Sequence, residues 1–243
     1  MSTVTTAPAL DRGQAMDKAL EEVRRYAELL SGLDEGQWSA PTECEPWTVR
    51  DMAAHVLGNH ESLLSVGSRL RQLRDARRYG GNLVDALSAT QIAKRAERTA
   101  QQVVADLKAA GPASVDARRR LPRALRAIRV SVPMRSGNEK WSVAYLDDVI
   151  YTRDTWMHRI DTCRAVGVEP QLTADHDGVI VADIVREWAT RHGQPFDLRL
   201  TGPAGGTFGD GGGYTLDLDA VEFCRLLSGR GRGEGLLAVE VGY

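Results

Sequence analysis

Three polar side chains in residues 147–164, DDVIYTRDTWMHRIDTCR, have types and spacing suited to chemistry. Asp154 and His158 are four residues apart and Asp161 follows three residues later, so on an α-helix all three share one narrow stripe. A carboxylate and an imidazole at this spacing can bind a metal ion together, as in helix-borne zinc motifs. Such pairs are also common as solvated or capping pairs, so the spacing alone leaves both interpretations open.

A third ligand must come from another element, and His55 is the candidate. Thr48 is a typical N-cap residue and Asp51 follows three residues later, which predicts a capping-box-like start for a helix over residues 48–78. On that helix Asp51 either caps the first turn or orients the imidazole of His55, since one side chain does not easily do both. His60 is five residues beyond His55 and faces another side of the helix, so the two histidines do not share a site.

The three cysteines, Cys44, Cys163 and Cys224, are far apart and odd in number, and no C-x-x-C motif occurs. This pattern indicates neither a disulfide framework nor a cysteine-based zinc knuckle. Cys44 lies in a rigid connector, residues 38–47, that has two prolines and a tryptophan at each end. We expect it to be a small buried apolar residue, with a metal or nucleophilic role as the alternative.

Hydrophobic periodicity predicts four helices, at residues 14–31, 48–78, 83–110 and 141–166. Gly111-Pro112 is expected to end the third helix and Gly167 the fourth. Four helices with a polar cluster facing inward are typical of a helix-bundle site. We therefore expect a flexible N-terminus at residues 1–13 and a bundle domain at residues 14–170.

The pattern changes after Pro170, and residues 171–243 are predicted to form a small α/β domain. We expect helices at residues 175–191 and 219–227 and strands at residues 196–201, 214–218 and 236–241. The glycine-rich stretch at residues 202–213 is followed by strand-like alternation rather than by a helix. It is therefore interpreted as a flexible turn and not as a phosphate-binding loop.

The composition is that of a soluble globular protein: 243 residues, 42% hydrophobic and 26% charged, with a formal net charge of −2. This balance gives no general attraction to nucleic acid or to anionic membranes. The arginine-rich residues 118–129 lack interleaved aromatic side chains, so a solvated connector or an anion or partner contact is favoured over nucleic-acid binding. No apolar run approaches the ~20 residues of a membrane span, and the first residues do not resemble a signal peptide. We expect a cytoplasmic protein, with monomer and dimer not distinguished.

Three stretches together resemble the mycothiol-dependent maleylpyruvate isomerase family. WSAPTECEPWTVRDMAAH is similar to the entry to the second helix of that family, RDTWMHRIDTCRAVG to its fourth-helix motif, and LDAVEFCRLLSGR to its small C-terminal domain. The two bundle motifs in this order and at this separation are a fairly specific signal. The resemblance covers the chain from about residue 20 to the end and implies a DinB-like four-helix bundle followed by a small, sterol-carrier-like α/β domain.

The resemblance also implies a divalent metal, usually zinc, held at His55, Asp154 and His158. The enzyme for which the family is named has Glu at the position of Asp154, and Asp is one methylene shorter. Two histidines and one carboxylate leave a fourth zinc position open, which is typical of a catalytic site. In the family this position serves mycothiol, a cysteine-containing thiol of actinobacteria, whose thiolate is stabilised by the zinc.

Two functions of different classes follow. The first is an S-transferase or cis–trans isomerase that uses mycothiol on a small electrophilic substrate. Asp161 is then a candidate to orient a ligating histidine, with a salt bridge to Arg159 or Arg164 as the alternative. Arg225 and Arg230 are candidates to pair with an anionic substrate, with a helix C-terminus role as the alternative. The second function, favoured by the change from Glu to Asp, is a non-catalytic ligand-binding or regulatory protein that keeps the DinB-like bundle.

Overall fold

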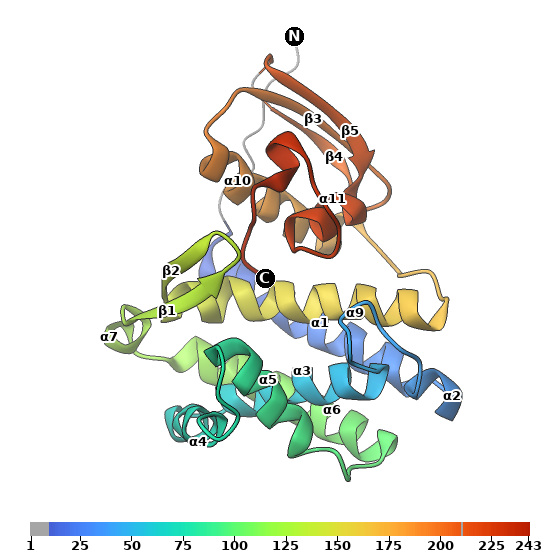
Figure 1. Cartoon of the computed structure of the whole chain (residues 1–243), viewed down its shortest axis with the longest axis vertical. Coiled ribbons are helices and arrows are strands. Elements are labelled where there is room, and N and C mark those ends of the chain that lie inside the picture. Colours follow the sequence, from blue (N-terminus) through green and yellow to red (C-terminus); the bar gives the residue numbers. More distant parts are fainter. Residues whose placement is uncertain (1–9, 210) are drawn as a thin grey trace. The chain divides into compact units, whose positions relative to one another are not determined.

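The computed structural model describes residues 10–209 and 211–243, which fall into two compact units (Figure 1). One unit is Arg12–Pro170, and the other is built on Gln171–Tyr243. The expected fold class, a helical bundle followed by a small α/β part, is confirmed. Residues 1–9 of the predicted flexible N-terminus lie outside the described residues, and the first helix already begins at Arg12.

Four helices form the core of the first unit: α1 (Arg12–Ser31), α3 (Val49–Leu63), α6 (Ala100–Arg120) and α9 (Tyr151–Val166). Helices α1 and α3 each pack against both α6 and α9. Their apolar faces bury a continuous core, which includes Val23, Tyr26, Val56, Leu57 and Leu107. Burial of such faces is the main stabilising contribution to a bundle of this kind.

Two predicted helices are each divided in the structure. The helix expected over residues 48–78 ends at Leu63, and Ser65 caps a new helix, α4 (Val66–Ala76). The helix expected over residues 83–110 is two helices, α5 (Leu83–Ala93) and α6. Gly111-Pro112 does not end α6, which continues to Arg120. A Cβ on Gly111 would lie 2.6 Å from Val23 Cγ2. This glycine serves the close approach of α1 and α6 rather than a helix stop.

The segment between α6 and α9 also differs from the prediction. After the one-turn helix α7 (Arg123–Arg126), strands β1 (Arg129–Met134) and β2 (Gly137–Ser142) form an antiparallel hairpin that was not predicted. The expected helix over residues 141–166 begins as α8 (Val143–Tyr145) and a π-helical turn, η1 (Leu146–Ile150). The expected solvated connector is wrong for Arg118, which is buried in the last turn of α6 and donates to the carbonyl oxygen of Asp147.

The second unit is the predicted small α/β domain with one strand misplaced. A π-helical turn, η2 (Ala174–Gly178), leads into α10 (Val179–His192), and α11 (Ala220–Leu227) follows the sheet. Strands β3 (Phe196–Thr201), β4 (Gly206–Gly209) and β5 (Tyr214–Asp219) pair in the order β4-β3-β5, with β3 and β5 parallel. The strand expected at residues 236–241 is wrong: a 3₁₀ turn, η3 (Gly235–Ala238), occupies that segment, and the third strand lies within the glycine-rich stretch.

The side chains of α10, β3 and α11 meet in the core of this unit. The ring of Trp188 contacts Phe196 and Phe223 edge to face, with centroid separations of 5.0 and 5.3 Å. Its indole nitrogen donates to the carbonyl oxygen of Leu236 at 2.8 Å, which fixes the chain after α11. Among the described residues, none of the helices combines the length and the apolar character needed to cross a bilayer.

Candidate metal centre

Helices α3 and α9 bring His55, Asp154 and His158 together inside the bundle. One potential ligand atom from each residue lies within 4.8 Å of the other two. Asp154 Oδ1 is 3.3 Å from His158 Nε2 and 3.6 Å from His55 Nε2. Ligands that surround a tetrahedral zinc at about 2.0–2.1 Å are separated from one another by about 3.3 Å. The shorter Asp154 side chain therefore reaches both imidazoles.

The electrostatics of this cluster favour a negative carboxylate beside a protonated imidazole. Burial opposes the charge of Asp154, but His158 and His55 outweigh it and hold the pKa of Asp154 well below its usual value. Burial likewise disfavours the charged form of His158, but Asp154 and then Asp161 raise its pKa well above the usual value. Without a metal, the proton on His158 therefore supplies the positive charge that these acceptors require.

Asn59, one turn after His55 on α3, supports the carboxylate. Its amide nitrogen is 3.0 Å from Asp154 Oδ2 and 3.2 Å from His55 Nε2. The amide oxygen of Asn59 accepts from Gln91 Nε2 at 2.8 Å, and Gln91 Nε2 is also 3.1 Å from Gln72 Oε1. Three buried amides on α3, α4 and α5 thus fix the orientation of Asn59, and Asp154 is left with Oδ1 facing the two imidazoles.

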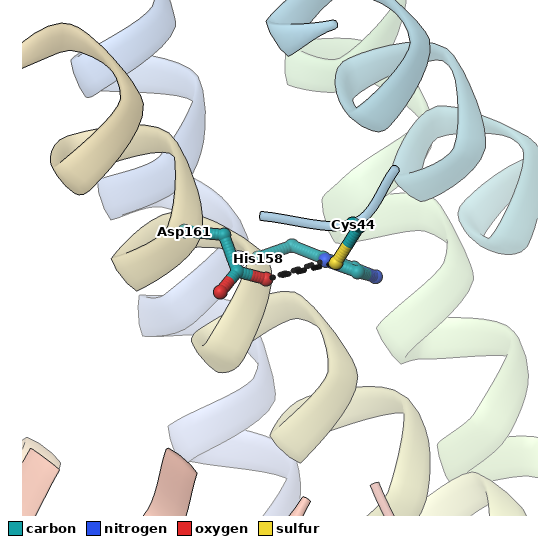
Figure 2. A group of neighbouring side chains, drawn as sticks. All are labelled: Cys44, His158 and Asp161. Carbon is teal, nitrogen blue, oxygen red and sulfur yellow. Dashed lines mark hydrogen bonds and ion pairs between the residues drawn. The ribbon is translucent and has the colours of Figure 1, made fainter. Parts of the chain in front are cut away.

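The other edge of the His158 ring faces a second cluster (Figure 2). His158 Nδ1 is 3.2 Å from Asp161 Oδ2, and Cys44 Sγ donates to the same oxygen at 3.6 Å. The side chain of Asp161 is fully buried. Arg159 and Arg164, the alternative partners considered for Asp161, reach Glu22 and Glu43 respectively.

A tightly bonded loop before α3 places Cys44 and Trp47. The amide of Thr42 donates to the carbonyl oxygen of Trp47, the amide of Trp47 donates to that of Cys44, and Pro41 pairs with Thr48 as an isolated bridge. The ring of Trp47 lies 5.0 Å from that of His55 and 6.0 Å from that of His158, between centroids. Trp47 therefore forms an apolar wall over the candidate ligands.

The remaining sequence candidates lie elsewhere. Asp51 caps α3 by accepting from the amide and the hydroxyl of Thr48, so it does not orient His55, and His55 Nδ1 has no hydrogen-bond partner among the described residues. His60 faces α6, where its Nδ1 is 2.7 Å from Ser114 Oγ. Arg225 and Arg230 belong to the second unit. There Arg225 pairs with Glu222 at 2.5 Å, and the amide of Arg230 donates to the carbonyl oxygen of Arg225.

Sequence reasoning missed Asn59 and Trp47. Asn59 follows His55 by four residues, the spacing that had drawn attention to Asp154 and His158, so its position on the same helix face was available from the sequence. For Trp47, no local sequence pattern indicates that its ring covers two histidines.

The fold and the cluster define a DinB-like helical bundle with a histidine–carboxylate centre and a small α/β unit. Residues 19–163 match the family described as the mycothiol maleylpyruvate isomerase N-terminal domain, and the chain belongs to that family. It is similar in fold to the crystal structure of the mycothiol-dependent maleylpyruvate isomerase, with a TM-score of 0.57, 17% sequence identity, and coverage of 91% of this chain and 90% of that chain. A histidine-to-alanine mutant of that enzyme is equally similar, with a TM-score of 0.56, 16% identity and the same coverage. No curated protein matches the chain in sequence.

Proposed function

We propose that this protein is a metal-dependent enzyme that uses the thiolate of mycothiol to isomerise, or to transfer the thiol to, a small electrophilic substrate. The observation that carries the proposal is the convergence of His55, Asp154 and His158, whose ligand atoms lie within 4.8 Å of one another. Family membership supports the thiol and the reaction class.

The residues fit a divalent cation, most simply zinc. Two imidazoles and one carboxylate are a ligand set that leaves a tetrahedral zinc one open position. The side chain of Asp154 is 19% exposed, so solvent reaches the cluster. When bound, the metal supplies charge that stabilises a thiolate at neutral pH.

The surrounding side chains have definite parts in this proposal. Asp161 accepts a hydrogen bond from Nδ1 of His158 and so leaves the lone pair of Nε2 for the metal. Asn59 holds the outer oxygen of Asp154. The ring of Trp47 excludes water from one side of the histidines, which strengthens the electrostatic interactions at the centre.

Metal analysis tests the proposal. Full-length protein supplied with zinc should contain about one zinc per chain. Loss of a residue that only orients a metal ligand lowers metal affinity roughly 10–100-fold, and the zinc affinity of His55→Ala should fall by more than that. His60→Gln is the matched control, because His60 lies on the same helix but faces Ser114. Titration of mycothiol into the zinc-loaded protein should saturate, and maleylpyruvate is the first substrate to assay.

The alternative is a non-catalytic ligand-binding or regulatory protein that keeps the bundle. A wild-type protein that takes up no zinc when zinc is supplied would overturn the enzyme proposal in favour of this alternative. Stoichiometric zinc together with thiol-dependent turnover would rule the alternative out.

A further inference from the structure

The imidazole of His158 separates two sets of ligand atoms, one at each ring nitrogen. Nε2 faces Asp154 and His55, and Nδ1 faces Asp161 and Cys44. Figure 2 shows the second set: His158 and Asp161 project from neighbouring turns of α9, and Cys44 approaches them from the loop before α3. These atoms also lie within 4.8 Å of one another.

The separations in the second set are those of ligands around one tetrahedral ion. For zinc, with about 2.3 Å to sulfur and about 2.0–2.1 Å to nitrogen or oxygen, a sulfur and an oxygen are about 3.6 Å apart and a nitrogen and an oxygen about 3.3 Å. Cys44 Sγ is 3.6 Å from Asp161 Oδ2, and His158 Nδ1 is 3.2 Å from the same oxygen. The two residues on α9 are buried and Cys44 is half-buried, so an ion reaches them from the side of the loop.

We propose that Cys44, His158 and Asp161 form a second cation position, selective for thiophilic divalent ions such as Cd²⁺ and Zn²⁺. Sulfur, nitrogen and oxygen together favour such ions over hard ones such as Mg²⁺. On binding, the Cys44 thiol loses its proton to solvent as the sulfur–metal bond forms. The position does not require the proposed function, because neither His55 nor Asp154 belongs to it.

The two positions exclude each other. A neutral imidazole has one lone pair, and its other nitrogen carries a proton. When an ion is at Nε2, the N–H at Nδ1 donates to Asp161; when an ion is at Nδ1, the N–H at Nε2 donates to Asp154. A thiophilic ion in the second position therefore removes His158 from the first set and leaves that set with two ligands.

Cadmium binding to full-length protein tests this inference, because a cadmium–thiolate bond gives an ultraviolet charge-transfer band. His55→Ala disables the first set and keeps the second, so this variant should bind one Cd²⁺ per chain and show the band. The double variant His55→Ala/Cys44→Ser should lose the band and bind Cd²⁺ at least tenfold more weakly. If His55→Ala folds poorly, Asp154→Asn and the double variant Asp154→Asn/Cys44→Ser provide the same comparison.

The outcomes separate this inference from the proposed function. Absence of the band in both His55→Ala and Asp154→Asn overturns the second position, as does a band that persists after Cys44→Ser, which would come from Cys163 or Cys224. The single variant Cys44→Ser keeps the first set, so its zinc content tests the proposed function alone. If the wild-type chain bound two Cd²⁺ at once, each as tightly as when the other position is empty, the mutual exclusion would be overturned.

Discussion

Two neighbouring residues of α9 enter very different buried environments. Arg159 forms two hydrogen bonds with Glu22 of α1, at 2.6 and 3.2 Å, and both side chains are almost fully buried. His158 instead lies among groups that are mainly acceptors, with Asp154 on one side and Asp161 on the other. In the first case one guanidinium faces one carboxylate, whereas in the second one imidazole lies between two carboxylates.

This difference separates an ion pair that stabilises a fold from a cluster that can bind a ligand. Buried charges are costly unless they are paired, so the Glu22–Arg159 pair is needed once the fold has placed either residue. In the acceptor cluster, formed by Asp154, His158 and Asp161, the proton on His158 or a bound cation offsets part of the same cost.

Glu22→Gln should weaken folding without weakening metal binding. The change removes the negative charge that faces the buried guanidinium of Arg159, which is expected to lower the free energy of unfolding by about 3–5 kcal/mol. Chemical denaturation followed by the helical circular-dichroism signal measures this. Glu21→Gln is the matched control, since Glu21 pairs with Arg24 and Arg25 near the surface and should contribute less than about 1 kcal/mol.

Zinc affinity of the folded Glu22→Gln protein should remain that of the wild type. A loss of affinity as large as that of His55→Ala would show that the ion pair and the acceptor cluster act as one unit, and the comparison would fail.

The sequence predicted the cluster of candidate ligands better than the residues that support it. Asp154 and His158 became candidates because helix periodicity, a local property, places them on one face, and His55 was the candidate from another helix. The buried amide chain is not local: a Cβ on Gly58 would lie 2.4 Å from Gln91 Cγ, so a glycine on α3 lets α5 deliver the amide that orients Asn59. Sequence spacing contains no signal for such an approach between helices.

The predictions for Cys44 and for the third strand were limited in the same way, because both depend on contacts between segments distant in sequence. Cys44 was expected to be a buried apolar residue, but its environment depends on how a loop closes against α9. Residues 236–241 alternate like a strand, yet β4 is short, contains Gly206 and Gly209, and is held by pairing with β3. Whether a segment pairs in a sheet depends on neighbours that are distant in sequence.

Asn59→Leu should weaken metal binding. Without the amide, Asp154 Oδ2 loses its 3.0 Å hydrogen bond and the carboxylate is free to rotate away from the imidazoles. Loss of a residue that orients a metal ligand typically lowers affinity roughly 10–100-fold. Competition with a chelator of known affinity measures the change in zinc dissociation constant.

Thr90→Val is the matched control for Asn59→Leu. Thr90 is also a buried polar residue and lies on α5, but its hydroxyl donates to the carbonyl oxygen of Ala86 in its own helix. The control should bind zinc as the wild type does. Equal affinity of Asn59→Leu and wild type would mean that Asp154 needs no support, and the amide chain would be only a packing feature.

The smallest effect is a pH dependence that differs between metal-free and zinc-loaded protein. The pKa of His158 is raised above its usual value of about 6.5. The stability that its proton contributes is therefore complete below about pH 6.5 and is lost as the pH rises through the folded-state pKa. The pKa of Asp154 is lowered, so its contribution is present above about pH 3.9 and is lost as the pH falls. Metal-free protein should therefore be most stable between these limits and lose at most about 1.4 kcal/mol per pH unit on the basic side for one proton.

Zinc should abolish the basic loss, because Nε2 of His158 then binds the ion and carries no proton in the folded state. Thermal unfolding of metal-free and zinc-loaded protein from pH 6 to pH 9 measures the difference, and metal-free His158→Gln should lack the loss attributed to this proton. A basic loss of equal size in the metal-free wild type and in His158→Gln would place the responsible proton on another group. The acceptor cluster would then resemble the Glu22–Arg159 pair, satisfied by the fold itself and without need of a cation.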